Sequence, residues 1–228
     1  ADQLDGNVSI VLLLDYTVGS DGVVVNTEVN HLTDIRHKRL GAEKGAVSHF
    51  TLLKAIEKAG LSKEDVEIVF ADQAELQKQF EKGMIDGFST YDPYLYEQKL
   101  KGKDIVFSSA EIPITIYDVL VVRNHAIPLS ILSSIQRLWF SMVAEPRPFD
   151  ALLPYYGYNQ AYIDYVQHAL YMTGKLDNYH ASLTSTVYFK KNMNDWVAFL
   201  KQNQLISQTF SSDKIQLRTY VMHSSEAR

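Results

Sequence analysis

The segment from Leu40 to Pro93 constrains the fold most, because it alternates short apolar runs with helical patterns. Strands are expected at residues 39–42, 66–70 and 85–89, with one helix in each interval between them. This strand–helix–strand–helix–strand order is typical of a parallel sheet whose crossover helices cover its faces. The segment therefore predicts an α/β fold with mainly parallel sheets.

Local signals mark the ends of both helices. Ser48 stands where the cap of the first helix is expected, and Gly60 follows the last helical position. In the second helix, Asp72 and Glu75 have the spacing of a capping box, and Gly83 is the expected stop. Both helices are therefore short and bounded by residues that favour helix ends.

The same topology predicts where a ligand would bind. In open α/β sheets, ligands lie beyond the carboxyl ends of the strands, against the amino ends of helices. Ser48 begins a helix at such a place, and the Tyr91–Asp92 loop follows the third strand. We expect these two places to face each other across a ligand site.

The flanking segments predict further strands and helices. Before the central segment, residues 8–14 are expected to form a buried strand that ends in a loop at Asp15, and residues 23–26 form a second strand. After it, apolar spacing predicts a return strand at 118–123, a helix from Pro128, helices at 160–172 and 192–203, and a last strand at 215–221.

Composition excludes several classes of function. The 228 residues, 46% hydrophobic, suffice for one large domain or two lobes. A net charge of −5 without a run of Lys or Arg argues against a nucleic-acid partner. The absence of cysteine excludes disulfides and thiolate chemistry, and the histidine spacing provides no metal motif. No glycine-rich nucleotide motif is present either, so neither a cofactor nor a metal is expected.

The first candidate site is the helix start at Ser48. Its hydroxyl and the free amides of the first turn would hold a carboxylate, sulfonate or nitrate, and Gly45 leaves backbone room for it. His49 belongs to the same site. The alternative for Ser48 is a plain helix cap. A catalytic Ser–His pair is disfavoured, because adjacent helix residues point in different directions.

The second candidate set is Tyr91 and Asp92, and the third is Asp15, Tyr16, Ser20 and Asp21. An aromatic ring beside a carboxylate suits a ligand with an amine or amide. The alternatives are an Asp–Pro turn for the second set and an Asp/Gly-rich turn for the third. A calcium loop is rejected, because Val18 and Gly19 interrupt the alternation of oxygen ligands.

Several motifs occur in order along the chain. They lie at 34–40; at Gly45, Ser48, His49 and Leu52; at Phe80, Gly83 and Asp86; at Tyr91–Asp92; and in the loop with Asp15, Tyr16, Gly19 and Asp21. Together they resemble one family, the periplasmic substrate-binding proteins of ABC importers, in the NMT1/THI5-like branch for nitrate, sulfonates, taurine and thiamine-pyrimidine precursors. His37 stands where this family usually has glycine.

The resemblance implies a type II periplasmic-binding-protein fold with two lobes that close on a ligand in the cleft between them. Lobe 1 would contain residues 1–25, which include the first crossover, and residues 118–228; lobe 2 would contain residues 26–117. The family's first lobe normally begins with further strands and helices, so an amino-terminal segment is expected to be missing here.

The resemblance also implies a function without catalysis. The expected role is to capture a small anionic or zwitterionic molecule, such as a sulfonate, taurine, nitrate or a thiamine-pyrimidine precursor. Membrane subunits of an ABC importer would be the partners of this monomeric protein, exported to the periplasm or cell envelope by a leader outside this chain. Two alternatives stay open: a ligand-sensing ectodomain of a histidine kinase or cyclase, and a pyrimidine-biosynthesis enzyme of the related fold.

Overall fold

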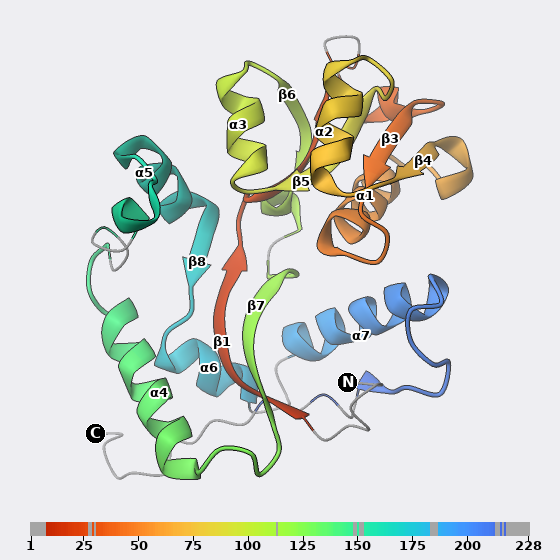
Figure 1. Ribbon diagram of the computed structural model, residues 1–228. Coiled ribbons are helices and arrows are strands. Elements are labelled where there is room, and N and C mark those ends of the chain that lie inside the picture. Colours follow the sequence, from red (N-terminus) through yellow and green to blue (C-terminus); the bar gives the residue numbers. More distant parts are fainter. Residues whose placement is uncertain are drawn as a thin grey trace. The chain divides into compact units, whose positions relative to one another are not determined.

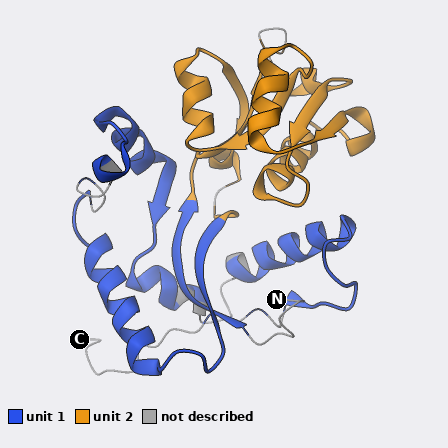
Figure 2. Ribbon diagram, viewed as in Figure 1, with its two compact units in different colours: residues 1–16, 117–228 blue, residues 17–116 orange. Residues whose placement is uncertain are grey.

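The computed structural model divides the chain into two compact units (Figures 1 and 2). It describes residues 8–26, 29, 31–112, 114–147, 150, 153–182, 187–212, 215 and 217. Unit 1 comprises residues 1–16 and 117–228, and unit 2 comprises residues 17–116. The chain therefore passes from one unit to the other twice. Within the described ranges, no helix is long and apolar enough to cross a membrane.

Unit 2 is built on a mixed five-stranded sheet in the order β4-β3-β5-β2-β6 (Figure 1). Its strands are β2 (Asp21–Val25), β3 (Arg39–Ala42), β4 (Glu67–Phe70), β5 (Gly87–Tyr91) and β6 (Asp104–Ser108). As expected, β3 is parallel to β4 and β5. The expectation of mainly parallel sheets needs correction, because β2 inserts antiparallel between β5 and β6.

The helices of unit 2 are α1 (Val47–Lys58), α2 (Gln73–Glu81) and α3 (Tyr94–Leu100), with short 3-10 helices at Leu32–Ile35, Lys63–Asp65 and Ser109–Glu111. The first two helices end where the sequence predicts. Gly60 and Gly83 follow α1 and α2 with φ of 68° and 67°, a backbone region that glycine enters without steric cost. Asp72 caps α2 by accepting a hydrogen bond of 2.9 Å from the amide of Glu75.

The two faces of this sheet carry separate cores, because successive residues of a strand point to opposite sides. Val23 and Val25 of β2 belong to one cluster, which includes Leu52 and Ile56 of α1. Val24 belongs to the other cluster, with the following buried residues of α2, α3, β5 and the loop before β5: Leu76, Phe80, Ile85, Phe88 and Leu95. The continuous apolar run of β2 is thus explained by burial on both faces.

Unit 1 contains a three-stranded sheet in the order β7-β1-β8. Its strands are β1 (Val8–Thr17), β7 (Tyr117–Arg123) and β8 (Leu170–Met172), and β1 is antiparallel to β7. The loop predicted to begin at Asp15 is wrong, because pairing with β7 extends β1 to Thr17. Asp15 and Tyr16 therefore lie in a strand, opposite Asp118 and Tyr117.

The helices of unit 1 are α4 (Leu129–Val143), α5 (Gln160–Ala169), α6 (Lys175–Ser182) and α7 (Val187–Gln202), with a 3-10 helix at Leu153–Tyr156. The helix predicted at 160–172 ends three residues early, because Leu170–Met172 joins the sheet as β8. Of the last strand expected at 215–221, Leu217 forms a parallel bridge with Ile10. Residues 216 and 218–221 lie outside the described residues.

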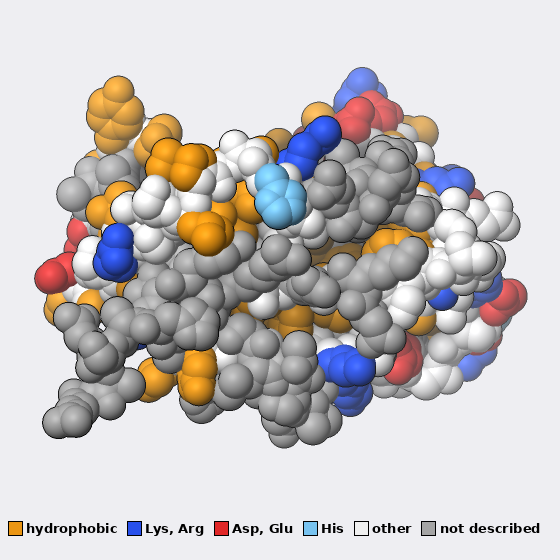
Figure 3. All heavy atoms as spheres, turned by 90° about the horizontal axis from the view of Figure 1, so that it is seen from below, with side chains coloured by type: hydrophobic (Ala, Val, Ile, Leu, Met, Phe, Trp, Pro, Cys, Tyr) orange, Lys and Arg blue, Asp and Glu red, His pale blue; other side chains and the backbone are white. Residues whose placement is uncertain are grey.

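Apolar side chains also reach the surface of unit 1. Leu129, Ile131 and Leu138 of α4 are exposed, and Arg137 is the only charged residue of this helix. Figure 3 shows hydrophobic side chains among acidic and basic ones on one face of the molecule. A helix this apolar is usually covered on most sides.

Candidate functional site

The start of α1 differs in detail from the prediction. Ala46, not Ser48, occupies the capping position, and it makes no side-chain capping bond. Ser48 is the second residue of the helix and is buried; its hydroxyl accepts a hydrogen bond of 3.1 Å from the amide of Glu43. The predicted cap is wrong because the helix already begins at Val47, and the hydroxyl of Ser48 bonds to the preceding loop instead of capping the helix.

The missing cap leaves donors at the start of α1. The carbonyl of Ala46 accepts from the amides of His49 and Phe50, at 3.1 and 3.2 Å, so it is the first acceptor of the helix. The amides of Val47 and Ser48 precede these bonds and have no acceptor within the helix. Together with the helix dipole, these amides favour a negative group at this point.

His49 and Gly45 fix the shape of the loop before α1. Gly45 has a φ of 80°, and its amide donates to Nδ1 of His49 at 3.3 Å. The buried imidazole lies edge-on to Phe70, with ring centroids 4.9 Å apart. Burial, and then the charge of Lys44, lower the pKa of His49 from its ordinary value. The histidine thus supports the loop as a neutral side chain.

We expect the protein to lose stability when the pH falls below about 6.5, the ordinary pKa of histidine. The folded state holds the pKa of His49 below that value, so as the pH falls the ring takes up a proton in the unfolded chain before it does so in the folded protein, which favours unfolding. Melting temperatures measured between pH 7.5 and 5.5 should fall less steeply for His49→Gln than for the wild type. His168→Gln, at an exposed position, should leave the slope unchanged; equal slopes for all three proteins would contradict the assignment.

Tyr91 and Asp92 lie at the carboxyl end of β5. Burial, and then the charge of Glu43 and its interaction with the hydroxyl, raise the pKa of Tyr91. Oδ1 of Asp92 accepts from the amide of Tyr96 at 3.0 Å, so this carboxylate supports the first turn of α3. Tyr91 is therefore held toward the loop before α1, and Asp92 is held toward α3.

Ser20 and Asp21 adjoin the same end of the sheet. Asp21 is the cross-strand partner of Tyr91, and its charge contributes to the raised pKa of Tyr91. The carbonyl of Ser20 accepts from the amide of Asp92 at 2.9 Å. Both residues are buried. Unit 2 thus brings together the predicted residues Gly45, Ser48, His49, Tyr91, Asp92, Ser20 and Asp21 at the carboxyl ends of β3 and β5.

Two residues at this place were missed by the sequence analysis, Glu43 and Gln73. Glu43 directly follows β3, and Gln73 is the first residue of α2. Nε2 of Gln73 donates to Oε2 of Glu43 at 3.0 Å and to the carbonyl of Ser89 at 3.3 Å. Neither residue belongs to a recognisable motif, so only the folded arrangement reveals the pair.

Asp15 and Tyr16 belong to unit 1. The ring of Tyr16 stacks on Tyr171 with centroids 4.6 Å apart and meets the edge of Tyr117 at 6.3 Å. Burial, and then the neighbouring Tyr171 and Asp177, raise the pKa of Tyr16. Tyr16 is therefore part of an aromatic cluster around the end of β1, and its role in ligand binding stays a prediction.

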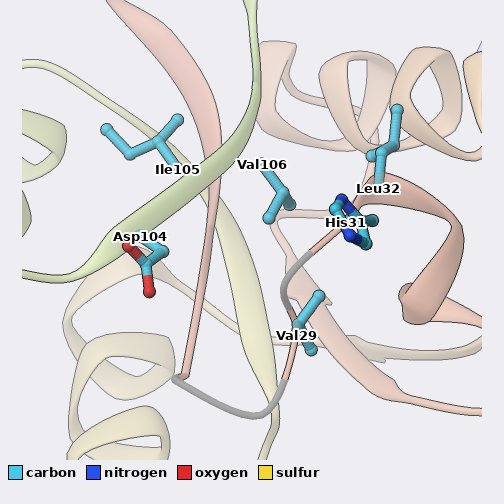
Figure 4. Close-up of a pocket in the computed structure, with 6 residues that line it drawn as sticks. All are labelled: Val29, His31, Leu32, Asp104, Ile105 and Val106. Atoms are coloured by element: carbon cyan, nitrogen blue, oxygen red, sulfur yellow. The ribbon is translucent and has the colours of Figure 1, made fainter.

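A pocket of about 390 Å³ opens elsewhere in unit 2, as Figure 4 shows. Its lining residues follow β2 or begin β6: Val29, His31, Leu32, Asp104, Ile105 and Val106. Asp104 pairs with Val25, whereas Tyr91 pairs with Asp21 at the other end of β2. The pocket is therefore at the opposite end of the sheet from Tyr91, and none of the predicted site residues lines it. The described side chains include no metal-binding group of three or more His, Cys, Asp or Glu.

Comparison with known proteins establishes the family. The model of a family described as NMT1/THI5 like matches residues 8–131, more than half of the chain. The chain belongs to the NMT1/THI5-like family. An aliphatic sulfonates-binding protein of Escherichia coli (strain K12) is 29% identical over 80 residues, which are 35% of this chain and 25% of that protein. The chain thus spans a quarter of the length of this curated relative.

Solved structures show the fold of this NMT1/THI5-like chain. The periplasmic aliphatic sulphonate binding protein SsuA from Escherichia coli aligns with a TM-score of 0.69 and 16% identity, over 95% of this chain and 71% of that chain. The alkanesulfonate-binding protein SsuA from Xanthomonas axonopodis pv. citri, bound to MOPS, aligns with a TM-score of 0.66 and 15% identity, over 95% and 76%. The expected type II periplasmic-binding-protein fold is confirmed.

One departure from the NMT1/THI5-like pattern has a structural explanation. His37 stands where the resembling proteins usually have glycine, and its φ is 63°. This left-handed conformation costs a residue with a Cβ roughly 1–2 kcal/mol, which glycine avoids. His37 keeps the turn because its amide donates to the carbonyl of Asp65 at 2.7 Å.

Proposed function

We propose that the chain is part of a solute-binding protein that captures a small anionic or zwitterionic molecule, with a sulfonate as the ligand class. The observation that carries this proposal is the uncapped start of α1 at the carboxyl edge of the unit 2 sheet, beside Tyr91. A sulfonate presents several acceptor oxygens, which suits the amides of Val47 and Ser48 and the helix dipole. Two similar proteins are described as binding aliphatic sulfonates or MOPS.

Delivery to the membrane subunits of an ABC importer, in the periplasm or cell envelope, is the role that fits such a protein. A binding role is favoured over catalysis, because the nearest candidate base is already used. His49 accepts a hydrogen bond from Gly45 and packs its ring against Phe70. Its neighbour Ser48 directs its hydroxyl oxygen to Glu43.

Isothermal titration with ethanesulfonate, butanesulfonate and MOPS tests the proposal, with acetate and butyrate as carboxylate controls. A sulfonate present at a hundred times its dissociation constant should also stabilise the fold by about 2.7 kcal/mol. Saturable binding of at least one sulfonate, tighter than the matched carboxylate, is the expected result. Absence of heat and of any shift in melting temperature with all three sulfonates would overturn the proposal.

Ala46→Asp separates the anion site from the stability of α1. Ala46 already has the extended backbone of a capping residue, so aspartate should cap the helix and stabilise the protein by about 1 kcal/mol. Its carboxylate would occupy the place proposed for the ligand, so sulfonate affinity should fall by more than about tenfold.

Ala46→Asn is the matched control, because asparagine caps a helix equally well without a charge. It should gain similar stability and lose less sulfonate affinity than Ala46→Asp. Unchanged affinity in Ala46→Asp, with the stability gain present, would remove α1 from the site.

A further inference from the structure

The carboxylate of Glu43 lies at the proposed anion site, although a negative side chain would weaken the binding of a simple anion. Glu43 follows β3 directly, and its own amide donates to the hydroxyl of Ser48 in the first turn of α1. The charge is therefore built into the loop from which the helix starts. A ligand that meets these amides also meets the field of this carboxylate.

Two neighbours hold this carboxylate in place. Gln73 donates to Oε2 of Glu43 at 3.0 Å, and Tyr91 lies near enough to the same carboxylate for Glu43 to raise the pKa of its hydroxyl. Gln73 is only 4% exposed and is also anchored to the carbonyl of Ser89. Because three elements (the β3–α1 loop, α2 and β5) meet at Glu43, its charge is preorganised.

The surroundings contain an excess of acceptors. Nε2 of Gln73 faces two acceptors, and this determines which way the side-chain amide is oriented. Its Oε1 is then buried without a hydrogen-bond partner among the described residues. Oγ of the buried Ser89 also has no hydrogen-bond partner among the described residues. Within the part of the chain that the structure describes, Glu43 forms no ion pair; Nζ of its neighbour Lys44 lies over the ring of Phe70 instead, 5.9 Å from the centroid.

A fixed carboxylate with acceptors around it and no cationic partner is complementary to a cation that donates several hydrogen bonds. We infer that Glu43, held by Gln73 and Tyr91, determines specificity by binding an ammonium or similar N–H cation of the ligand. The ligand class is then a zwitterion, with an anionic group at the start of α1 and an amino group at Glu43. This inference rests on the proposed function and narrows its ligand.

Titration of the intact chain with three sulfonates of similar size tests the inference: taurine, isethionate and propanesulfonate. They carry an ammonium, a hydroxyl and a methyl group at the same position. The wild type should bind taurine at least about tenfold more tightly than propanesulfonate, with isethionate between them. In Glu43→Gln the affinity for taurine should fall by about tenfold and that for propanesulfonate should stay equal or rise.

Glu64→Gln is the control for loss of one negative charge, because Glu64 is exposed and lies in the 3-10 helix at Lys63–Asp65, away from this loop; it should keep the preference for taurine. If the wild type binds propanesulfonate as tightly as taurine, or if Glu43→Gln keeps the ratio, the inference is overturned and sulfonate capture still stands. If the wild type binds none of the three, the inference falls together with the proposed function. The wild-type series does not depend on the folding of any variant.

Discussion

Phe88→Ala should lower the free energy of unfolding by about 3–5 kcal/mol. Phe88 is fully buried in the core cluster that β5 shares with α2 and α3. Its ring centroid lies 5.2 Å from that of Phe80, and the cluster also includes Leu76. Truncation to alanine removes a large apolar side chain and leaves a cavity between sheet and helix. Because β5 also pairs with β2 and β3, the surrounding backbone has little freedom to close it.

Urea denaturation followed by far-ultraviolet circular dichroism measures this loss. Fluorescence of Trp139 and Trp196 should be recorded in parallel, because both tryptophans belong to unit 1. Phe70→Ala is the matched control: Phe70 is 44% exposed at the end of β4, and its removal should cost about 1 kcal/mol. Equal losses for the two variants would contradict the assignment of Phe88 to the core.

Asn178→Leu should destabilise unit 1 by about 3 kcal/mol, through lost hydrogen bonds and not through a cavity. Oδ1 of Asn178 accepts from the amide of Leu13 at 2.8 Å. Nδ2 lies 3.1 Å from each of three acceptors, the carbonyls of Leu13 and Gly174 and Oγ1 of Thr173. The side chain thus connects α6 to β1 in a buried environment, and leucine would leave the amide of Leu13 without a partner.

Tryptophan fluorescence during urea denaturation is the appropriate measurement, because Nε1 of Trp139 donates to the carbonyl of Thr173 at 3.0 Å, next to this network. Asn203→Leu is the control. Asn203 makes one such bond, to the carbonyl of Phe199 at 2.8 Å, at the partly exposed end of α7. Its loss should cost about 1 kcal/mol. A similar cost at both positions would argue against a buried network around Asn178.

Local signals explain why the ends of α1 and α2 and the start of α2 could be predicted. Gly60 and Gly83 end these helices through left-handed conformations, and Asp72 caps α2 through its own side chain. None of these effects depends on distant parts of the chain. The order of strands in the sheet does depend on distant parts of the chain: β2 lies between β5 and β6, although more than sixty residues separate it from β5 in the sequence. The antiparallel pairing of β2 could therefore not be derived from its own apolar pattern.

Long-range pairing also explains the errors at Asp15 and at Leu170–Met172. The acidic and polar residues that follow Leu14 are typical of a loop, yet pairing with β7 extends β1 through them. Leu170 continues the apolar spacing of α5, yet the segment that it begins becomes β8. In both cases a neighbouring strand outweighs a local preference.

The candidate site was predictable in position and less so in detail. Ser48 and Tyr91 both contact Glu43, so the helix start and the end of β5 do lie together, as expected from the parallel strand order. Their part in binding stays a prediction. Ser48 does not cap α1, because the helix already begins at Val47 and the hydroxyl of Ser48 accepts from the amide of Glu43 in the preceding loop. Glu43 and Gln73 escaped notice because two single polar residues thirty positions apart carry no pattern.

The amide of Thr17 donates to the carbonyl of Ile116 at 3.0 Å, so the chain enters and leaves unit 2 at neighbouring points. A segment whose two ends lie side by side can be replaced by a segment of the same fold without changing the rest of the chain. Residues 17–116 therefore form a cassette that contains the start of α1, Glu43 and Tyr91. Recombination at these two junctions would transfer the proposed anion site in a single event, and would leave the host strands β1 and β7 in register.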